Sequence, residues 1–130
     1  MPKLSPSATA RLSVLNEFMA RVQRVHGLVE QYATNRMNPD QHLMPMTRAF
    51  SQLKLQFMGA GFDSMSQLCG SMEIASKRGL SYMQKVRILR DGVGSLKFQL
   101  EMEQRAVVSD DLARQARDNA EEAEAAEEEP

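Results

Sequence analysis

Apolar residues recur every three or four positions through most of this 130-residue chain, and this spacing limits its fold more than any other feature. Such spacing lines one face of an α-helix, whereas a half-buried strand would alternate apolar and polar residues. The first third of the chain predicts a long amphipathic helix, with polar residues on its other face. Its apolar positions are Leu12, Leu15, Phe18, Met19, Val22, Val25, Val29 and Tyr32.

A second helix is expected from about residue 39 to residue 58. Asn38 is a candidate N-cap, Pro39 suits the first helical position, and Gln41 stands where a capping box places it. Pro45 lies inside this segment, so it either kinks the helix or moves its start to about residue 45. The expected buried face consists of Leu43, Met46, Phe50, Leu53 and Phe57.

Two further helices follow the glycine-rich corner at residues 59–61. Asp63 is positioned to cap the third helix, which is expected to reach about Arg78 and to stop at Gly79. Ser81 is the expected cap of the fourth helix. The apolar face of the fourth helix consists of Tyr82, Val86, Leu89, Val93, Leu96 and Leu100.

Gly92 and Gly94 interrupt the fourth helix, and they mark either a bend or a close contact between helices. Four amphipathic helices with short connections predict an all-α fold, an up-and-down four-helix bundle. The absence of Trp and the scarcity of Ile agree with helix rather than strand.

The single cysteine, Cys69, excludes an internal disulfide. It lies among apolar residues, which suggests a small core side chain rather than a nucleophile. No stretch has the roughly 20 apolar residues of a membrane span, and the first ten residues lack the apolar run of a signal peptide. We therefore expect a soluble, cytoplasmic protein that does not enter membranes.

Charge is divided unevenly along the chain. From Ser109 onward it carries nine acidic and two basic residues, whereas the part before it carries 14 basic and eight acidic residues. The expected organisation is an N-terminal extension (1–8), a helical bundle (9–108) and a disordered acidic tail (109–130). A second interpretation has the tail folding back over basic residues of the fourth helix, namely Lys85, Arg87, Arg90 and Lys97.

The segment from residue 50 to residue 79 resembles the core of histidine phosphotransfer (HPt) domains. These domains carry a phospho-accepting His on the second bundle helix, followed by a Leu-Lys-Gly step, a later Gly, and a helix with Leu, Cys and an acidic residue. The matching residues here are Leu53, Lys54, Gly61, Met65, Leu68, Cys69 and Glu73. Ser51 stands at the position of the His, and Leu55 replaces the small residue after the Lys.

The resemblance implies an HPt-type bundle without phosphotransfer. A phosphoramidate on imidazole passes readily to an aspartate, whereas a phosphate ester on serine does not, so no catalytic residue is expected. His42 lies about two and a half turns before Ser51, too far for the same docking geometry. His26 lies within the first helix and is interpreted as a structural imidazole. No cofactor and no metal site is expected.

The flank of the second helix around Ser51 is the predicted partner-binding site. Helical spacing places Met44, Ser51, Leu55 and Met58 together, away from the core direction set by Phe50. Exposed apolar surface of this kind marks interaction sites. The alternative is that another helix covers the flank. The predicted partner-binding residues are Met44, Arg48, Ser51, Lys54, Leu55 and Met58.

Two functions follow from these observations. The first is a pseudo-HPt module that docks on a response-regulator receiver domain or a histidine kinase and modulates bacterial-type two-component signalling without relaying phosphate. The alternative is a helical adaptor or chaperone that holds a partner helix, with a homodimer through the same flank as its simplest form. No constellation of catalytic residues indicates an enzyme. Basic residues without interleaved aromatics, together with the acidic tail, argue against nucleic-acid binding.

Overall fold

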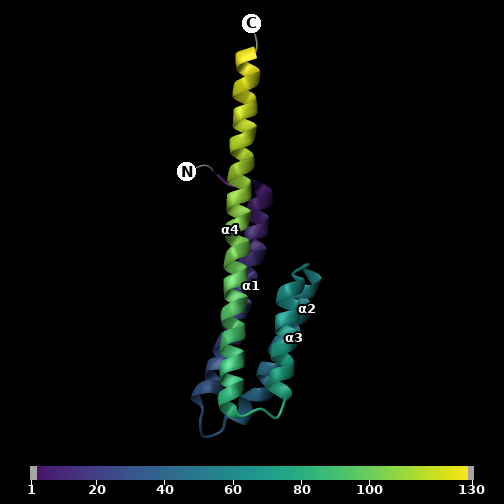
Figure 1. Ribbon diagram of the computed structural model, residues 1–130, viewed down its shortest axis with the longest axis vertical. Helices are drawn as coiled ribbons and strands as arrows, with labels where there is room; N and C mark the ends of the chain where they lie inside the picture. Colours follow the sequence, from purple (N-terminus) through teal and green to yellow (C-terminus); the bar gives the residue numbers. More distant parts are fainter. Residues whose placement is uncertain (1–2, 129–130) are drawn as a thin grey trace.

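The chain forms an all-α bundle, as the apolar spacing predicts (Figure 1). The computed structural model describes residues 3–128. Residues 1–2 and 129–130, at the ends of the expected N-terminal extension and acidic tail, lie outside the described part. The elements are α1 (Pro6–Thr34), the 3₁₀ helix η1 (Pro39–His42), α2 (Leu43–Gly59), α3 (Asp63–Lys77) and α4 (Tyr82–Glu128).

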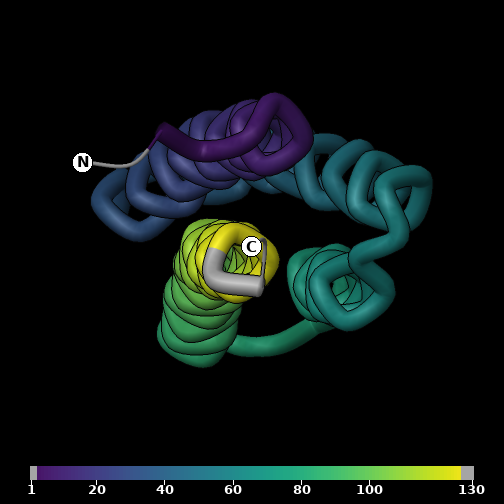
Figure 2. The backbone as a smooth tube through the Cα atoms, turned by 90° about the horizontal axis from the view of Figure 1, so that it is seen from above, coloured from purple at the N-terminus to yellow at the C-terminus, as the bar shows by residue number. Residues whose placement is uncertain are grey.

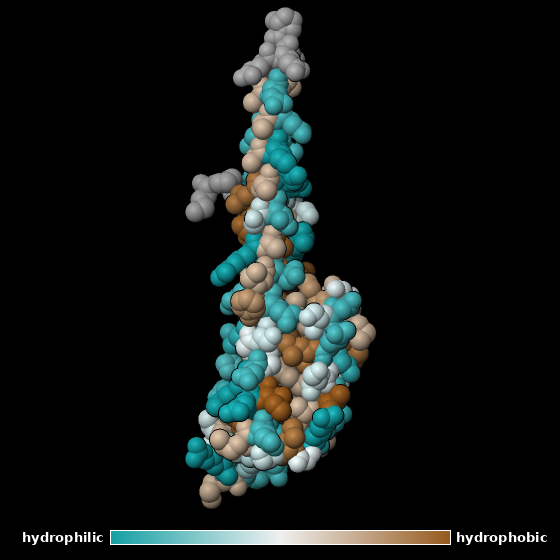
Figure 3. Space-filling view, in the orientation of Figure 1, coloured by the Kyte–Doolittle hydropathy of each residue, from teal (hydrophilic) through white to brown (hydrophobic). Residues whose placement is uncertain are grey.

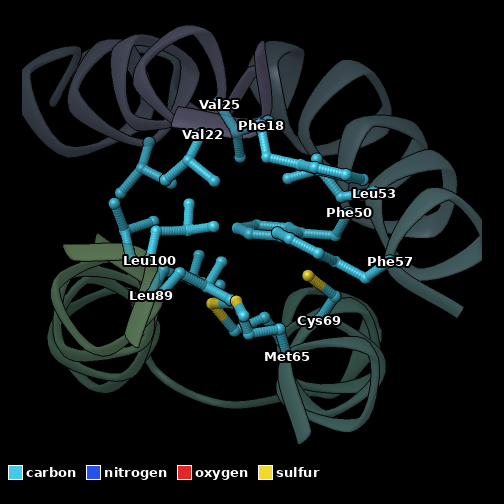
Figure 4. Packing of buried hydrophobic residues seen from close by; sticks show 14 of the residues in the cluster. Phe18, Val22, Val25, Phe50, Leu53, Phe57, Met65, Cys69, Leu89 and Leu100 are labelled. Carbon is cyan, nitrogen blue, oxygen red and sulfur yellow. The ribbon is translucent and has the colours of Figure 1, made fainter. Parts of the chain in front are cut away.

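The four α-helices alternate in direction and surround one interior (Figure 2), which buried apolar side chains fill. Helix α1 packs against α2 and α4, and α3 packs against the same two helices from the other side. Aromatic rings anchor the contact between α1 and α2, where Phe18 and Phe57 stack with centroids 4.5 Å apart. Figure 4 shows side chains of all four helices converging on this core, among them Cys69 of α3. The interpretation of Cys69 as a core residue is confirmed, since its side chain is fully buried.

Helix α1 begins earlier than its apolar pattern suggests. Pro6 is its first residue, and the hydroxyl oxygen of Ser5 caps it by accepting a hydrogen bond from the backbone N–H of Ala8 at 3.1 Å. Ala8 is buried against the core, so part of the expected N-terminal extension belongs to the bundle. The signal was present in the sequence, because Ser followed by Pro is a favoured pair of N-cap and first helical residue.

The capping predictions had mixed outcomes. Ser81 and Gln84 form the reciprocal hydrogen bonds of a capping box at the start of α4, as the expected role of Ser81 requires. Asp63, by contrast, is the first residue inside α3, and the prediction that it caps this helix is wrong. Asn38 also makes no side-chain cap; its backbone N–H donates to the side-chain oxygen of Asn35 at 3.1 Å.

Proline chemistry explains the divided second helix. Pro45 lies in the first turn of α2. The N–H groups of the first turn have no partner within the helix, so the lack of an N–H in proline costs no helical hydrogen bond there. The preceding residues 39–42 wind as the 3₁₀ helix η1 instead of extending the α-helix. The α-helix therefore starts at Leu43, between the two starts that the sequence allowed.

Gly92 marks a close contact between α4 and α3. A Cβ atom at position 92 would overlap the sulfur of Met72, a residue that is itself buried in the core. A Cβ built on Gly94 would meet no atom within 4 Å. Of the two interpretations left open by the sequence, the close helix contact applies to Gly92.

The acidic tail continues α4 as far as Glu128, so the expectation of disorder after residue 109 is not met in the described part. Ala and Glu make up more than half of this segment and favour helix, and Gly is absent after Gly94. Figure 1 shows the end of α4 rising beyond the other helices, away from the N-terminal end of α4. The interpretation in which the tail folds back over Lys85, Arg87, Arg90 and Lys97 is therefore wrong for a single copy of the chain.

Polar contacts pair α4 with α1 along their shared length. The Arg90 guanidinium donates two hydrogen bonds to the Glu30 carboxylate, at 2.8 and 2.9 Å. The Lys97 ammonium lies 2.7 Å from Nδ1 of His26, and the side chain of Gln104 donates to that of Asn16 at 2.8 Å. The residue numbers of the α1 partners decrease as those of the α4 residues increase, as in an antiparallel pair of helices. Two of the four basic residues considered above are thus engaged by α1.

Candidate functional site

The predicted apolar flank of α2 is open to solvent. Met44 and Leu55 are 65% and 62% exposed, and Met58 is also exposed, whereas Phe50 on the core side is fully buried. No element among residues 3–128 covers these three side chains. The alternative that another helix of the same chain covers the flank is therefore wrong for the described part.

Half of the predicted site borders a groove between α2 and α3. The groove has a volume of about 500 Å³, and Met44, Arg48 and Ser51 of the predicted site lie on its α2 side. Lys54, Leu55 and Met58 follow farther along α2, outside the groove lining. The remaining lining residues are Leu43, Thr47, Glu73, Ser76, Lys77 and Lys85.

Hydroxyl groups join the two helices beside the groove. The hydroxyl of Ser76 donates to the backbone oxygen of Glu73 at 2.7 Å, which uses its only proton. Thr47 must therefore donate to Ser76 across the 2.7 Å between their hydroxyl oxygens. Because Ser76 is buried, this bond joins α2 and α3 at a point shielded from solvent.

Lys54 does not project freely into solvent. Its ammonium lies 3.4 Å from one carboxylate oxygen of Glu73, and Lys77 lies 3.2 Å from the other. The hydrogen bond from Lys77, together with the charge of Lys54, holds the pKa of Glu73 below its usual value, against the opposing effect of burial. Among the described residues that line the groove, Glu73 is the only acidic one, and these two lysines neutralise it.

Lys85 is a groove residue that the predicted site did not include. It comes from the start of α4, and only 8% of its surface is exposed. Neither a hydrogen bond nor an ion pair to its ammonium group is present within residues 3–128. The signal in the sequence was its position, three residues after Tyr82 and four before Leu89 on the apolar face of the helix.

Neither of the two histidines lies near Ser51. His26 contacts Lys97 and lies 3.6 Å from Glu30 at the junction of α1 and α4. His42 lies in η1, 3.2 Å from the side-chain nitrogen of Asn35. Neither His lines the groove, so no imidazole is placed beside Ser51 to accept a phosphoryl group.

Comparisons with known proteins leave the family open: no protein-family model, curated protein or solved structure matches this chain. Within residues 3–128, none of the helices combines the length and the apolar character needed to cross a bilayer. The same residues contain no cluster of three or more His, Cys, Asp or Glu side chains that would hold a metal ion.

Proposed function

We propose that this chain is a pseudo-HPt binding module, which docks on a receiver domain or a histidine kinase through α2 and modulates signalling without passing on phosphate. The observation that carries the proposal is the open groove beside Ser51, with exposed Met44 at its rim. The similarity of residues 53–73 to the HPt pattern supplies the class of partner.

The chemistry of the groove suits protein recognition better than group transfer. Arg48 and Lys85 supply two cations that are not paired with the neighbouring Glu73, and Ser51 supplies a hydroxyl. An acidic side chain of a partner would find complementary charge there, while Met44 and Leu55 would bury apolar surface around it. Methionine suits such a rim because its flexible side chain adapts to different partner shapes.

A helical adaptor is the second candidate, and one observation favours it. The exposed apolar residues continue past the groove to Met58, so the positions 44, 51, 55 and 58 form a stripe along nearly all of α2. A partner helix lying along α2 would cover the whole stripe. This adaptor would select an amphipathic helix and would show no preference for two-component proteins.

The test is a pull-down of the tagged full-length chain from a lysate of its source cells, with bound proteins identified by mass spectrometry. The variant carries Met44→Glu and Leu55→Glu, and the control carries Met37→Glu, which is 97% exposed in the loop before η1. Enrichment of a receiver-domain protein or histidine kinase by the wild type and the control, but not by the variant, supports the proposal. Enrichment of a protein without such a domain, lost in the same variant, favours the adaptor.

A further inference from the structure

The outward face of α4 carries apolar side chains that the described chain covers only in part. Phe98 and Met102 are 61% and 48% exposed, and Ile88 is exposed on the same side. At about 100° per residue, these residues fall opposite Gln104, which contacts α1, and Asp111, which contacts the N-cap Ser5 of α1. The face continues through small exposed residues, namely Ala106, Ser109, Ala113, Ala116, Ala120 and Ala123.

Side-chain size is graded along this face. The large apolar residues Ile88, Phe98 and Met102 lie in its first half, which also carries Asp91 and Ser95, and only small residues lie in its second half, from Ala106 to Ala123. Two such faces pack well when they run in opposite directions, because each large side chain then meets a small one. A parallel arrangement would oppose large residues to large ones and leave gaps between the alanines.

Charge along α4 is graded in the same way. Between residues 82 and 97 the helix carries four basic residues and one acidic residue, whereas between residues 110 and 128 it carries eight acidic and two basic residues. An antiparallel pair places the basic half of each helix beside the acidic half of the other, and it also aligns the helix dipoles favourably. A parallel pair would bring the two acidic halves together.

We propose that two copies of the chain associate through this face of α4 as an antiparallel, two-fold symmetric dimer centred near residues 105–106. A two-fold axis there matches Ile88 of one copy with Ala123 of the other, and Phe98 with Ala113. The shared face is roughly 50 Å long at about 1.5 Å per residue. Pairing supports the end of α4, which otherwise extends alone beyond the bundle (Figure 1).

The space-filling view shows the surface that would be covered. In Figure 3, weakly apolar residues form a line along the projecting part of α4, bordered by hydrophilic residues.

The groove beside Ser51 is formed mainly by α2 and α3, and of the described residues of α4 only Lys85 lines it. The dimer does not depend on the proposed function, and it leaves the Met44 and Leu55 flank free.

The first test is the molar mass of the full-length chain in solution, by light scattering or analytical ultracentrifugation. We expect a dimer that weakens as salt screens the charges, and a monomer when Phe98→Glu and Met102→Glu are combined. The matched control is Met44→Glu with Leu55→Glu, which places two charges on the exposed face of α2 and should leave the dimer intact. A wild-type monomer, or a dimer that survives the α4 variant, overturns the proposal.

The second test determines whether the two α4 helices of the dimer run antiparallel or parallel. Ser95→Cys and Ala116→Cys are made as separate variants, mixed, and treated with a short bis-maleimide cross-linker; Cys69 is fully buried and does not compete. The antiparallel dimer brings position 95 of one copy beside position 116 of the other and keeps the two copies of position 95 about 30 Å apart. Cross-linking in the mixture alone is the expected result. Cross-linking of each variant with itself would show a parallel pair and overturn the antiparallel arrangement.

Discussion

Ser5 and Asp111 lie 106 positions apart in the chain, yet both carboxylate oxygens of Asp111 accept hydrogen bonds from Ser5. The backbone N–H of Ser5 donates at 2.9 Å, and its hydroxyl donates at 2.6 Å. The same hydroxyl oxygen caps α1 by accepting from Ala8. One residue of the acidic segment therefore fixes the start of the first helix, which places this part of α4 within the folded structure.

Asp111→Asn should lower the melting temperature at neutral pH, and the difference from the wild type should shrink in acid. Hydrogen bonds from the hydroxyl and the N–H of Ser5, with smaller effects of Gln115 and Arg114, hold the pKa of Asp111 below its usual value. A lowered pKa in the folded state stabilises the fold above the pKa of the unfolded chain, about 3.9 for Asp, and this stabilisation is lost as the pH falls through the folded pKa. Thermal unfolding, followed by circular dichroism between neutral and acidic pH, measures the difference in melting temperature between the variant and the wild type.

The matched control for this prediction is Asp110→Asn, which removes the same charge from the exposed neighbouring position. It should change the melting temperature much less at every pH. Equal effects of the two variants would show that the hydrogen bonds to Ser5 contribute little.

Gly92→Ala and Gly94→Ala should change stability in opposite directions. The new methyl group at residue 92 would overlap the sulfur of Met72, so the core must shift, at a cost of about 1–3 kcal/mol. Residue 94 faces open space within the same helix, where alanine gains up to about 1 kcal/mol of helix propensity. Urea unfolding of the two variants gives both free energies, and destabilisation by Gly94→Ala would contradict the open environment at that position.

Leu53 and Leu55 should respond very differently to substitution, although they lie two residues apart on α2. Leu53 is 2% exposed, so Leu53→Ala should reduce the free energy of unfolding by about 2–5 kcal/mol. Leu55 faces solvent, so Leu55→Glu should change it by no more than about 0.5 kcal/mol. Chemical denaturation measures both values. A large loss of stability in the Leu55 variant would reveal a buried environment, and it would also remove this variant from binding experiments.

The thiol of Cys69 should be unreactive in the folded protein. Burial in the core raises its pKa to about 12, so the nucleophilic thiolate is scarce at neutral pH, and the side chain is also shielded from reagents. Ellman's reagent should therefore titrate the thiol only after denaturant is added. Rapid labelling under native conditions would indicate that α3 opens from the bundle.

Local features of the helices could be read from the sequence because they depend on near neighbours. The apolar spacing located the core residues of α1, α2 and α4, and Ser81 marked the start of α4 as its cap. The start of α1 at Pro6 could also be predicted from the sequence, since Ser5 and Pro6 form a standard helix start, but the apolar pattern alone indicates a later start. The acidic composition after residue 109 suggested disorder, although the same residues favour helix.

The sequence by itself determined the class of fold and the face of α2 that points away from the core, because helix periodicity sets which side chains share a face. Only the tertiary structure showed that Lys85 joins Arg48 and Ser51 around one groove, and that Lys54 is held by Glu73. It also decided between a bend and a close contact at Gly92, and it paired Ser5 with Asp111. The physical reason is that these relationships join residues on different helices, and their distances depend on how the helices pack rather than on spacing along the chain.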